Sequence, residues 1–414
     1  MMNTIKTKLI SAAVVLVFAS SATTQAMNLV MATDEENRNV LQSTIGLRTN
    51  DQWNVLAYQG TDLQMVDEIR QQAVTSNLPN AAQIPGATIR RWAALGFINN
   101  LDDAARQHQW SSRLPQTIRE DISFQDNLFA VPTQIHRSNW MWMNGNALNV
   151  GNKTMPAPKT WKAFFDFMDG GASGQRHLIT VDDPAQYTLI LESILLGLKG
   201  SAFYQSTFKD FDYRQLKSDD MVDVFRMMAR LRPLLNEHQY PDWESAAKAL
   251  ANGEGQVLFA GDWIKPMFVD TNGNLPEQLV CAPFPEASAK FLYNLNSVVM
   301  FRDTDELNSD IMAKLLFTET VLTDLNLREG SIPARLDISP YGFDRCAVRA
   351  MREFRSSHTT NTLQPSLAAG MAAPEGVQKS VYDAVNEFVA DTSMTPEEGA
   401  KNLAKAIRIA LYKI

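Results

Sequence analysis

Apolar residues recur at helical spacing in several segments of this sequence, and each segment begins at a residue that can cap a helix. Thr160 precedes an apolar stripe at positions i, i+3, i+4 and i+7 within residues 161–168, and Ser218 precedes a similar stripe. Asp183 and Thr395 are each followed by a proline, which is favoured at the first helical position. The pattern predicts a helix at each place, with its apolar face packed into a core.

Short apolar segments lie between these helices, at residues 54–58, 256–260 and 292–301. Helices that alternate with short strands predict an α/β fold. The sequence Gly-Asp-Trp at 261–263 directly follows one predicted strand, and the carboxyl ends of strands are where open α/β sheets bind ligands. We find no internal repeat and no flexible linker, which favours two lobes built from interleaved chain segments.

The N-terminal residues 1–26 have the pattern of a secretory signal peptide. Lys6 and Lys8 precede an apolar run, and Thr24-Gln25-Ala26 is an acceptable cleavage site. The alternative is a buried N-terminal helix. The sequence therefore predicts export through the inner membrane, with the periplasm as the location of the mature protein.

The remaining residues, about 390 in number, are enough for two lobes that each have a core. The formal charge is −8, and no basic stripe interleaved with aromatic residues occurs. This charge excludes an ordinary nucleic-acid-binding role, because binding to phosphates requires clustered Lys and Arg.

Signals of catalysis or metal binding are weak. The five histidines show no HExxH or other paired metal-ligand spacing, and no nucleophile elbow or phosphate-binding loop occurs. His136 is better explained as a hydrogen-bonded hinge or cleft residue than as a base. We predict that the protein is not an enzyme and uses no cofactor and no metal.

The chain has two cysteines, Cys281 and Cys346. In an oxidising compartment, a single pair most simply forms a disulfide. Two free buried thiols are the alternative.

Residues 125–168 carry the most informative pattern. A strand-like segment at 128–131 leads to His136 and Asn139, and the Pro-rich residues 155–158 precede the helix start at Thr160. This order resembles the interdomain crossing of bacterial extracellular solute-binding proteins of family 1. The similarity is greatest to the glucose/mannose-type branch of sugar receptors that serve ATP-binding-cassette (ABC) transporters.

The resemblance covers nearly the whole mature chain and implies a two-lobe periplasmic binding protein fold of type II, with interleaved lobes joined by a multi-segment hinge. Lobe one would hold residues 27–135 and 292–335, and lobe two would hold residues 136–291 and 336–414. The resemblance also implies a ligand site in the cleft between the lobes. The candidate ligand contacts are Trp263, Gln186, Asn296, Gln83, Asp183 and His136.

Many residues that contact sugar in the resembled branch are replaced in this chain. A tryptophan pair corresponds to Met31-Ala32, a tryptophan to Ala185, an aspartate to Asn296, a lysine to Glu329 and a histidine to Ala369. We therefore predict that the protein does not bind glucose in the manner of the branch. Acidic residues at 34–36 and 182–183 either line a cleft for a cationic or amino-sugar ligand or cap helices.

The resemblance predicts a carbohydrate receptor that closes by hinge motion and delivers its ligand to an ABC permease. The replaced residues favour an alternative, in which the protein is a periplasmic sensor or regulatory partner of another inner-membrane protein. Both functions require a small-molecule or membrane-protein partner, and neither involves nucleic acid.

Overall fold

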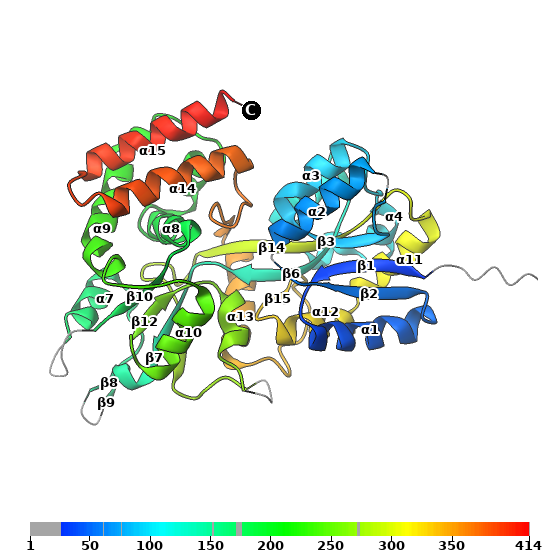
Figure 1. The fold of residues 1–414 in the computed structure, drawn as a ribbon, viewed down its shortest axis with the longest axis horizontal. Helices are drawn as coiled ribbons and strands as arrows, with labels where there is room; N and C mark the ends of the chain where they lie inside the picture. Colours follow the sequence, from blue (N-terminus) through cyan, green and yellow to red (C-terminus); the bar gives the residue numbers. More distant parts are fainter. Residues whose placement is uncertain are drawn as a thin grey trace, which may run out of the picture.

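The computed structural model describes residues 26–60, 62–75, 77–150, 153–170, 176–270 and 274–413. Within these residues the chain forms two main β-sheets, with helices around each, and the predicted α/β architecture is confirmed (Figure 1). Nearly all of the predicted signal peptide lies outside the described residues. None of the described helices has the length and apolar character needed to cross a bilayer.

The first sheet is mixed and has the strand order β15-β6-β14-β3-β1-β2, with β16 also paired to β14. β14 is antiparallel to β6 and β3, whereas β1 is parallel to β2 and β3. Its strands are β1 (Met27–Ala32), β2 (Trp53–Tyr58), β3 (Ala81–Pro85), β6 (Val131–Arg137), β14 (Phe291–Met300), β15 (Ile332–Pro333) and β16 (Leu363–Pro365).

The second sheet has the order β11-β10-β12-β7-β13, so that β11 and β13 are its edge strands. Its strands are β7 (Trp140–Asn144), β10 (Leu178–Val181), β11 (His238–Tyr240), β12 (Val257–Phe259) and β13 (Leu279–Pro283). Two small hairpins complete the strands: β4 (Ser123–Phe124) with β5 (Asn127–Leu128), and β8 (Asn149–Val150) with β9 (Lys153–Thr154).

Helices surround both sheets (Figure 1). Those on the side of the first sheet are α1 (Glu35–Thr49), α2 (Asp62–Val74), α3 (Gly86–Ala94), α4 (Asp102–Gln107), α5 (Trp110–Arg113), α6 (Gln116–Asp121), α11 (Glu306–Leu316) and α12 (Glu319–Arg328). Those on the side of the second sheet are α7 (Trp161–Met168), α8 (Pro184–Phe208), α9 (Asp219–Leu235), α10 (Trp243–Asn252), α14 (Glu375–Ala390) and α15 (Pro396–Leu411). Helix α13 (Arg345–Thr359) and the 3-10 helices η1 (Gly145–Leu148), η3 (Gln215–Lys217) and η4 (Asp262–Met267) complete the elements.

The predicted helix starts are confirmed. The side chains of Thr160, Asp183, Ser218 and Thr395 each accept a hydrogen bond from a backbone N–H in the first turn of the following helix. Such bonds satisfy donors that have no partner within the helix. Asp34 caps α1 in the same way, so the residues at 34–36 begin a helix.

Each sheet has its own buried apolar core. The first core contains residues from β1 to β6 together with β14, and the second contains residues from β7, α8, α9, α14 and α15. Helix α13 lies between them: Met351 and Phe354 belong to the first core, whereas Cys346 packs beside the second sheet. The exact lobe boundaries stay a prediction.

The predicted disulfide is confirmed. Cys281 in β13 is bonded to Cys346 in the first turn of α13, with a Cα–Cα distance of 5.9 Å. The bond therefore ties an edge strand of the second sheet to the helix that also contributes to the first core.

Candidate functional site

Four buried polar side chains lie on one face of the first sheet. Directly opposed residues of antiparallel strands point to the same face, and Asn296 of β14 lies opposite both Pro85 of β3 and Gln134 of β6. Because side chains alternate along a strand, Gln83 and His136 share this face. We call Gln83, Gln134, His136 and Asn296 the polar sheet face.

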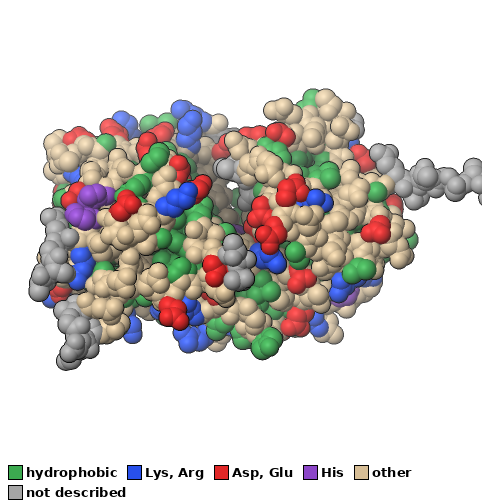
Figure 2. All heavy atoms as spheres, turned by 60° about the horizontal axis from the view of Figure 1, so that its bottom comes forward, with side chains coloured by type: hydrophobic (Ala, Val, Ile, Leu, Met, Phe, Trp, Pro, Cys, Tyr) green, Lys and Arg blue, Asp and Glu red, His purple; other side chains and the backbone are tan. Residues whose placement is uncertain are grey.

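The polar sheet face lies where the chain passes from one lobe to the other. Gln83 is in the middle of β3, and His136 is near the carboxyl end of β6, which is followed after two residues by β7 of the second sheet. Each of the four side chains is less than 8% exposed. Open α/β sheets bind ligands at the carboxyl ends of their strands, and the surface is hollowed between the two lobes (Figure 2).

His136, in the first sheet, contacts Asp262, which follows β12 of the second sheet. Its Nδ1 atom lies 2.9 Å from Oδ1 of Asp262, and Oδ2 of the same carboxylate accepts a 2.9 Å hydrogen bond from the backbone N–H of Arg137. Asp262 begins η4, directly after β12, and is 5% exposed. The predicted position of Gly-Asp-Trp at a strand end is thus confirmed, and its aspartate holds β6 rather than facing open solvent.

Trp263 lies beside this pair and is partly buried. A Cβ atom at Gly261 would come within 1.9 Å of its ring, so only glycine allows the ring to fold back over the backbone here. The ring meets Trp243 edge to face, with 6.1 Å between centroids. Trp243 was not predicted as a site residue; it begins α10, directly after the cap Asp242.

Asp183 joins the same group. Its Oδ1 atom caps α8, and its Oδ2 atom accepts a 3.0 Å hydrogen bond from Nε1 of Trp243. The structure therefore brings Asp183, Trp243 and Trp263 together in the second lobe.

Gln186 lies deeper and holds the second sheet together. Its side-chain amide donates to the carbonyl of Phe259 in β12 at 3.0 Å and accepts from the backbone N–H of Val181 in β10 at 2.8 Å. The residue is 1% exposed. These bonds give the side chain a structural role, and its role as a ligand contact stays a prediction.

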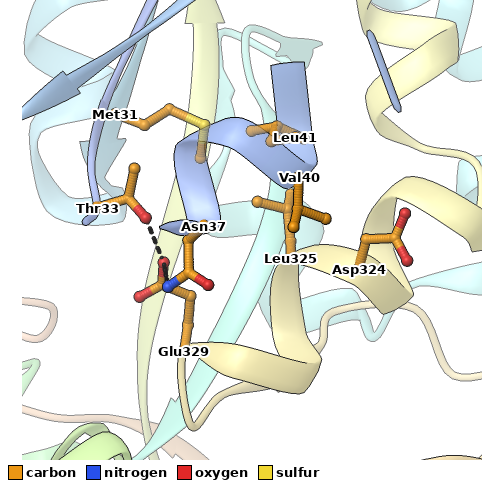
Figure 3. Close-up of a pocket in the computed structure, with 8 residues that line it drawn as sticks. All are labelled: Met31, Thr33, Asn37, Val40, Leu41, Asp324, Leu325 and Glu329. Atoms are coloured by element: carbon orange, nitrogen blue, oxygen red, sulfur yellow. Dashed lines mark hydrogen bonds between the residues drawn. The ribbon is translucent and has the colours of Figure 1, made fainter. Parts of the chain in front are cut away.

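Glu329 closes a small cavity at the end of α12 (Figure 3). Its Oε1 atom accepts hydrogen bonds from Oγ1 of Thr33 at 2.6 Å and from Nδ2 of Asn37 at 3.2 Å. The cavity measures about 10 Å³, which holds one water and no sugar ring. It is lined by Met31, Thr33, Asn37, Val40, Leu41, Asp324, Leu325 and Glu329.

A buried ion pair stiffens the crossing next to the polar sheet face. Arg137 is fully buried, pairs with Glu353 of α13 and stacks between Trp140 and Phe291, whose ring centroids are 4.5 and 4.6 Å from its guanidinium carbon. Burial acts to raise the pKa of Glu353, but the charges and hydrogen bonds of Arg137 and Arg349 hold that pKa below its ordinary value.

A second contact near the crossing lies at η4. Lys265 is 2% exposed, and its Nζ atom is 2.7 Å from Oδ2 of Asp344, the cap of α13. Gly330, at a φ of +82°, packs so closely on η4 that a Cβ atom there would be 2.4 Å from the carbonyl oxygen of Asp262. The crossing is therefore a closely packed joint made of short, specific contacts.

Among the described residues, one group of donors could hold a metal ion: His177, Glu237 and His238. It lies at β10 and β11 in the second sheet and is separate from the polar sheet face, which belongs to the first.

Comparison with known proteins agrees with this architecture. A sequence model of the family described as bacterial extracellular solute-binding protein matches residues 50–340. A probable sugar-binding periplasmic protein of Brucella suis biovar 1 is 30% identical over 356 residues, which cover 85% of this chain and 83% of that protein.

Solved structures show the same fold at low identity. The bacterial solute receptor AcbH, reported to prefer β-D-galactopyranose, superimposes with a TM-score of 0.72 at 14% identity, over 94% of this chain and 99% of that one. The acarbose-binding GacH receptor of Streptomyces glaucescens gives a TM-score of 0.71 at 15% identity, over 94% and 98% of the two chains.

Proposed function

Because the chain belongs to the bacterial extracellular solute-binding protein family, we propose that it is a periplasmic receptor that binds a carbohydrate between its lobes and passes it to an ABC permease. The observation that supports this proposal is the contact of His136, from the polar sheet face, with Asp262, because the next residue is Trp263, whose ring packs against Trp243. Such proteins close about their crossings when a ligand contacts both lobes.

The chemistry of the two sides suits a sugar. An aromatic ring packs against the apolar C–H face of a pyranose, and the amides of Gln83 and Asn296 offer both donors and acceptors to hydroxyl groups. In this proposal Trp263 is the aromatic contact, and Asp183 orients Trp243 behind it.

Glucose bound in the manner of the glucose/mannose branch does not fit this site. Met31, at the position of one branch tryptophan, is 2% exposed and belongs to the first core, so it offers no platform for a sugar ring. Glu329, at the position of a branch lysine, is already hydrogen bonded to Thr33 and Asn37. We therefore propose a carbohydrate other than free glucose, bound mainly against Trp263.

The test is native mass spectrometry of the purified mature protein, followed by calorimetric titration with a panel of mono- and oligosaccharides. We expect a carbohydrate to bind, and the Trp263→Ala variant to bind it about tenfold more weakly or worse because a ring contact is lost. Tyr412→Ala, which removes a ring that is 79% exposed directly after α15, is the matched control and should bind normally. Tight glucose binding, or equal affinity in both variants, would contradict the proposal.

A second candidate is a regulatory partner of another inner-membrane protein. Burial of Met31 in the core is the observation that favours it, because the branch's aromatic platform is then missing. No bound carbohydrate and no thermal shift with any sugar would support this candidate over transport.

A further inference from the structure

Three metal-binding side chains meet at the second sheet, in a place that the proposed carbohydrate site does not use. The Nδ1 atom of His177 is 3.4 Å from Oε1 of Glu237, and Nε2 of His238 is 3.5 Å from the same oxygen. All three donor atoms lie within 4.8 Å of one another. Histidine side chains gather at this surface, in purple at the left of Figure 2.

The sheet itself brings these residues together. His177 directly precedes β10 and His238 begins β11, and these two strands pair in parallel. Gln256 holds the backbone of His177 through two hydrogen bonds. The N–H of His177 donates to the side-chain oxygen of Gln256 at 2.7 Å, and the backbone N–H of Gln256 donates to the carbonyl of His177 at 2.9 Å. The carbonyl of His238 accepts a 3.1 Å hydrogen bond from Thr180. The two histidines are thus held at the starts of paired strands, and such placement on regular elements favours a precise metal site.

Within the described part of the chain, the two ring nitrogens nearest Glu237 make no hydrogen bond that a metal ion would have to displace. Neither Nδ1 of His177 nor Nε2 of His238 has a hydrogen-bond partner among the described residues, although both atoms are covered by protein. The rings are only 4.1 Å apart between centroids. Buried ring nitrogens without partners are unfavourable, and a bound cation would satisfy both.

The distances fit zinc. Zinc bonds to His nitrogen and carboxylate oxygen are about 2.0–2.1 Å long, so tetrahedral ligand atoms lie about 3.3 Å apart, close to the observed 3.4 and 3.5 Å. A hydrogen bond would be shorter than either distance. Two imidazoles with one carboxylate favour zinc and its neighbours in the first transition row over magnesium or calcium, which prefer all-oxygen sites.

We propose that His177, Glu237 and His238 bind a zinc ion, with the fourth position left to water or another exchangeable ligand. The side chain of Glu237 is 33% exposed, so the site opens to solvent on its carboxylate side. The ion joins the edge strand β11 to the start of β10, in a different sheet from the polar sheet face.

The test is calorimetric titration of tag-free protein with zinc chloride after treatment with a chelator. We expect one zinc per chain, and binding weakened by about tenfold or more in His177→Ala, Glu237→Gln and His238→Ala. His358→Ala, which removes an exposed histidine of α13, is the matched control and should bind zinc like the unmodified protein. Cobalt in place of zinc should give the visible absorption of a four-coordinate ion, and this band should be lost in the three variants.

Circular dichroism without metal shows whether each variant is folded. If an alanine variant is unfolded, the asparagine variant at the same position replaces it, because it keeps a polar group there without an imidazole. Absence of zinc binding by the unmodified protein would overturn the proposal, and so would unchanged affinity in all three folded variants.

Discussion

The Nδ1 atom of His136 lies 2.9 Å from Oδ1 of Asp262, and this contact joins the first sheet to the turn that follows β12 of the second. The other oxygen of Asp262 accepts from the backbone N–H of Arg137, so one carboxylate fixes two consecutive residues at the crossing. Both side chains are less than 10% exposed. Asp262 therefore links η4 to β6 through both of its carboxylate oxygens.

We expect Asp262→Ala to lower the free energy of unfolding by about 2–4 kcal/mol, because it leaves the His136 ring nitrogen and the Arg137 N–H buried without this acceptor. Asp262→Asn keeps the shape and one oxygen acceptor, so its loss should be smaller. Urea denaturation of the three proteins measures both effects. Equal stability of the alanine variant and the unmodified protein would show that the contact is not needed.

Alanine substitutions at two glycines with positive φ can distinguish the cost of backbone strain from the cost of a steric clash. Alanine at Gly342, φ +87°, would meet nothing within 4 Å, whereas alanine at Gly330, φ +82°, would come within 2.4 Å of the Asp262 carbonyl. Gly342→Ala should cost about 1–2 kcal/mol of unfolding free energy from the left-handed conformation alone. Gly330→Ala should cost about 1–3 kcal/mol more, because η4 must move. Equal losses in urea denaturation would contradict close packing at η4.

A buried carboxylate makes the stability of the protein depend on pH in a predictable direction. Glu192 of α8 is fully buried, and burial raises its pKa from 4.5 to about 7, although hydrogen bonds from Ser366, Tyr204 and the backbone of Leu367 oppose the shift. The unfolded chain loses the proton of Glu192 near pH 4.5, whereas the folded protein keeps it until about pH 7. The contribution of Glu192 to stability is therefore most favourable below pH 4.5 and falls as the pH rises to 7.

The variant Glu192→Gln cannot titrate at this position. Relative to this variant, the unmodified protein should lose about 3 kcal/mol of unfolding free energy between about pH 4.5 and about pH 8. Urea denaturation of both proteins at the two pH values gives their unfolding free energies. The contributions of the other titrating groups cancel when the values for the variant are subtracted from those for the unmodified protein. A difference that does not change with pH would contradict a raised pKa at Glu192.

Removal of the disulfide should destabilise the protein. Cys281 and Cys346 are 65 residues apart, and a loop of that length corresponds to about 4 kcal/mol in the chain-entropy model. The double variant Cys281→Ala/Cys346→Ala should have a free energy of unfolding about 4 kcal/mol lower, and its midpoint of urea denaturation should fall accordingly. Treatment of the unmodified protein with a reductant should approach the same midpoint, and the double variant should not respond to reductant.

The helix starts were predictable because their signals are local. Thr160, Asp183, Ser218 and Thr395 each cap a backbone donor within three residues, so neighbouring sequence determines the geometry. Proline at the first position adds a fixed φ after Asp183 and Thr395. Three strands, β2, β12 and β14, were recognisable from their apolar runs, but their partners in the sheets were not.

The candidate site was harder to predict because it depends on pairings between distant segments. Asp183 was recognised both as a cap and as a site residue, but its contact with Trp243 joins residues that are 60 positions apart. His177 and His238 show no metal-ligand spacing in the sequence because they meet only through the pairing of β10 with β11. Sequence spacing can reveal metal ligands that lie in one helix or one turn, but His177 and His238 come from two separate strand regions.

The central place of β14 has a consequence for how the chain folds. β14 pairs with both β6 and β3, yet the whole chain segment of the second sheet lies between β6 and β14 in the sequence. During synthesis or export, the first sheet therefore lacks a central strand until residue 300 has emerged, with β3 and β6 still exposing unpaired edges. Such long-range pairing makes folding slow, so the unpaired edges of β3 and β6 can aggregate until the last third of the chain is present.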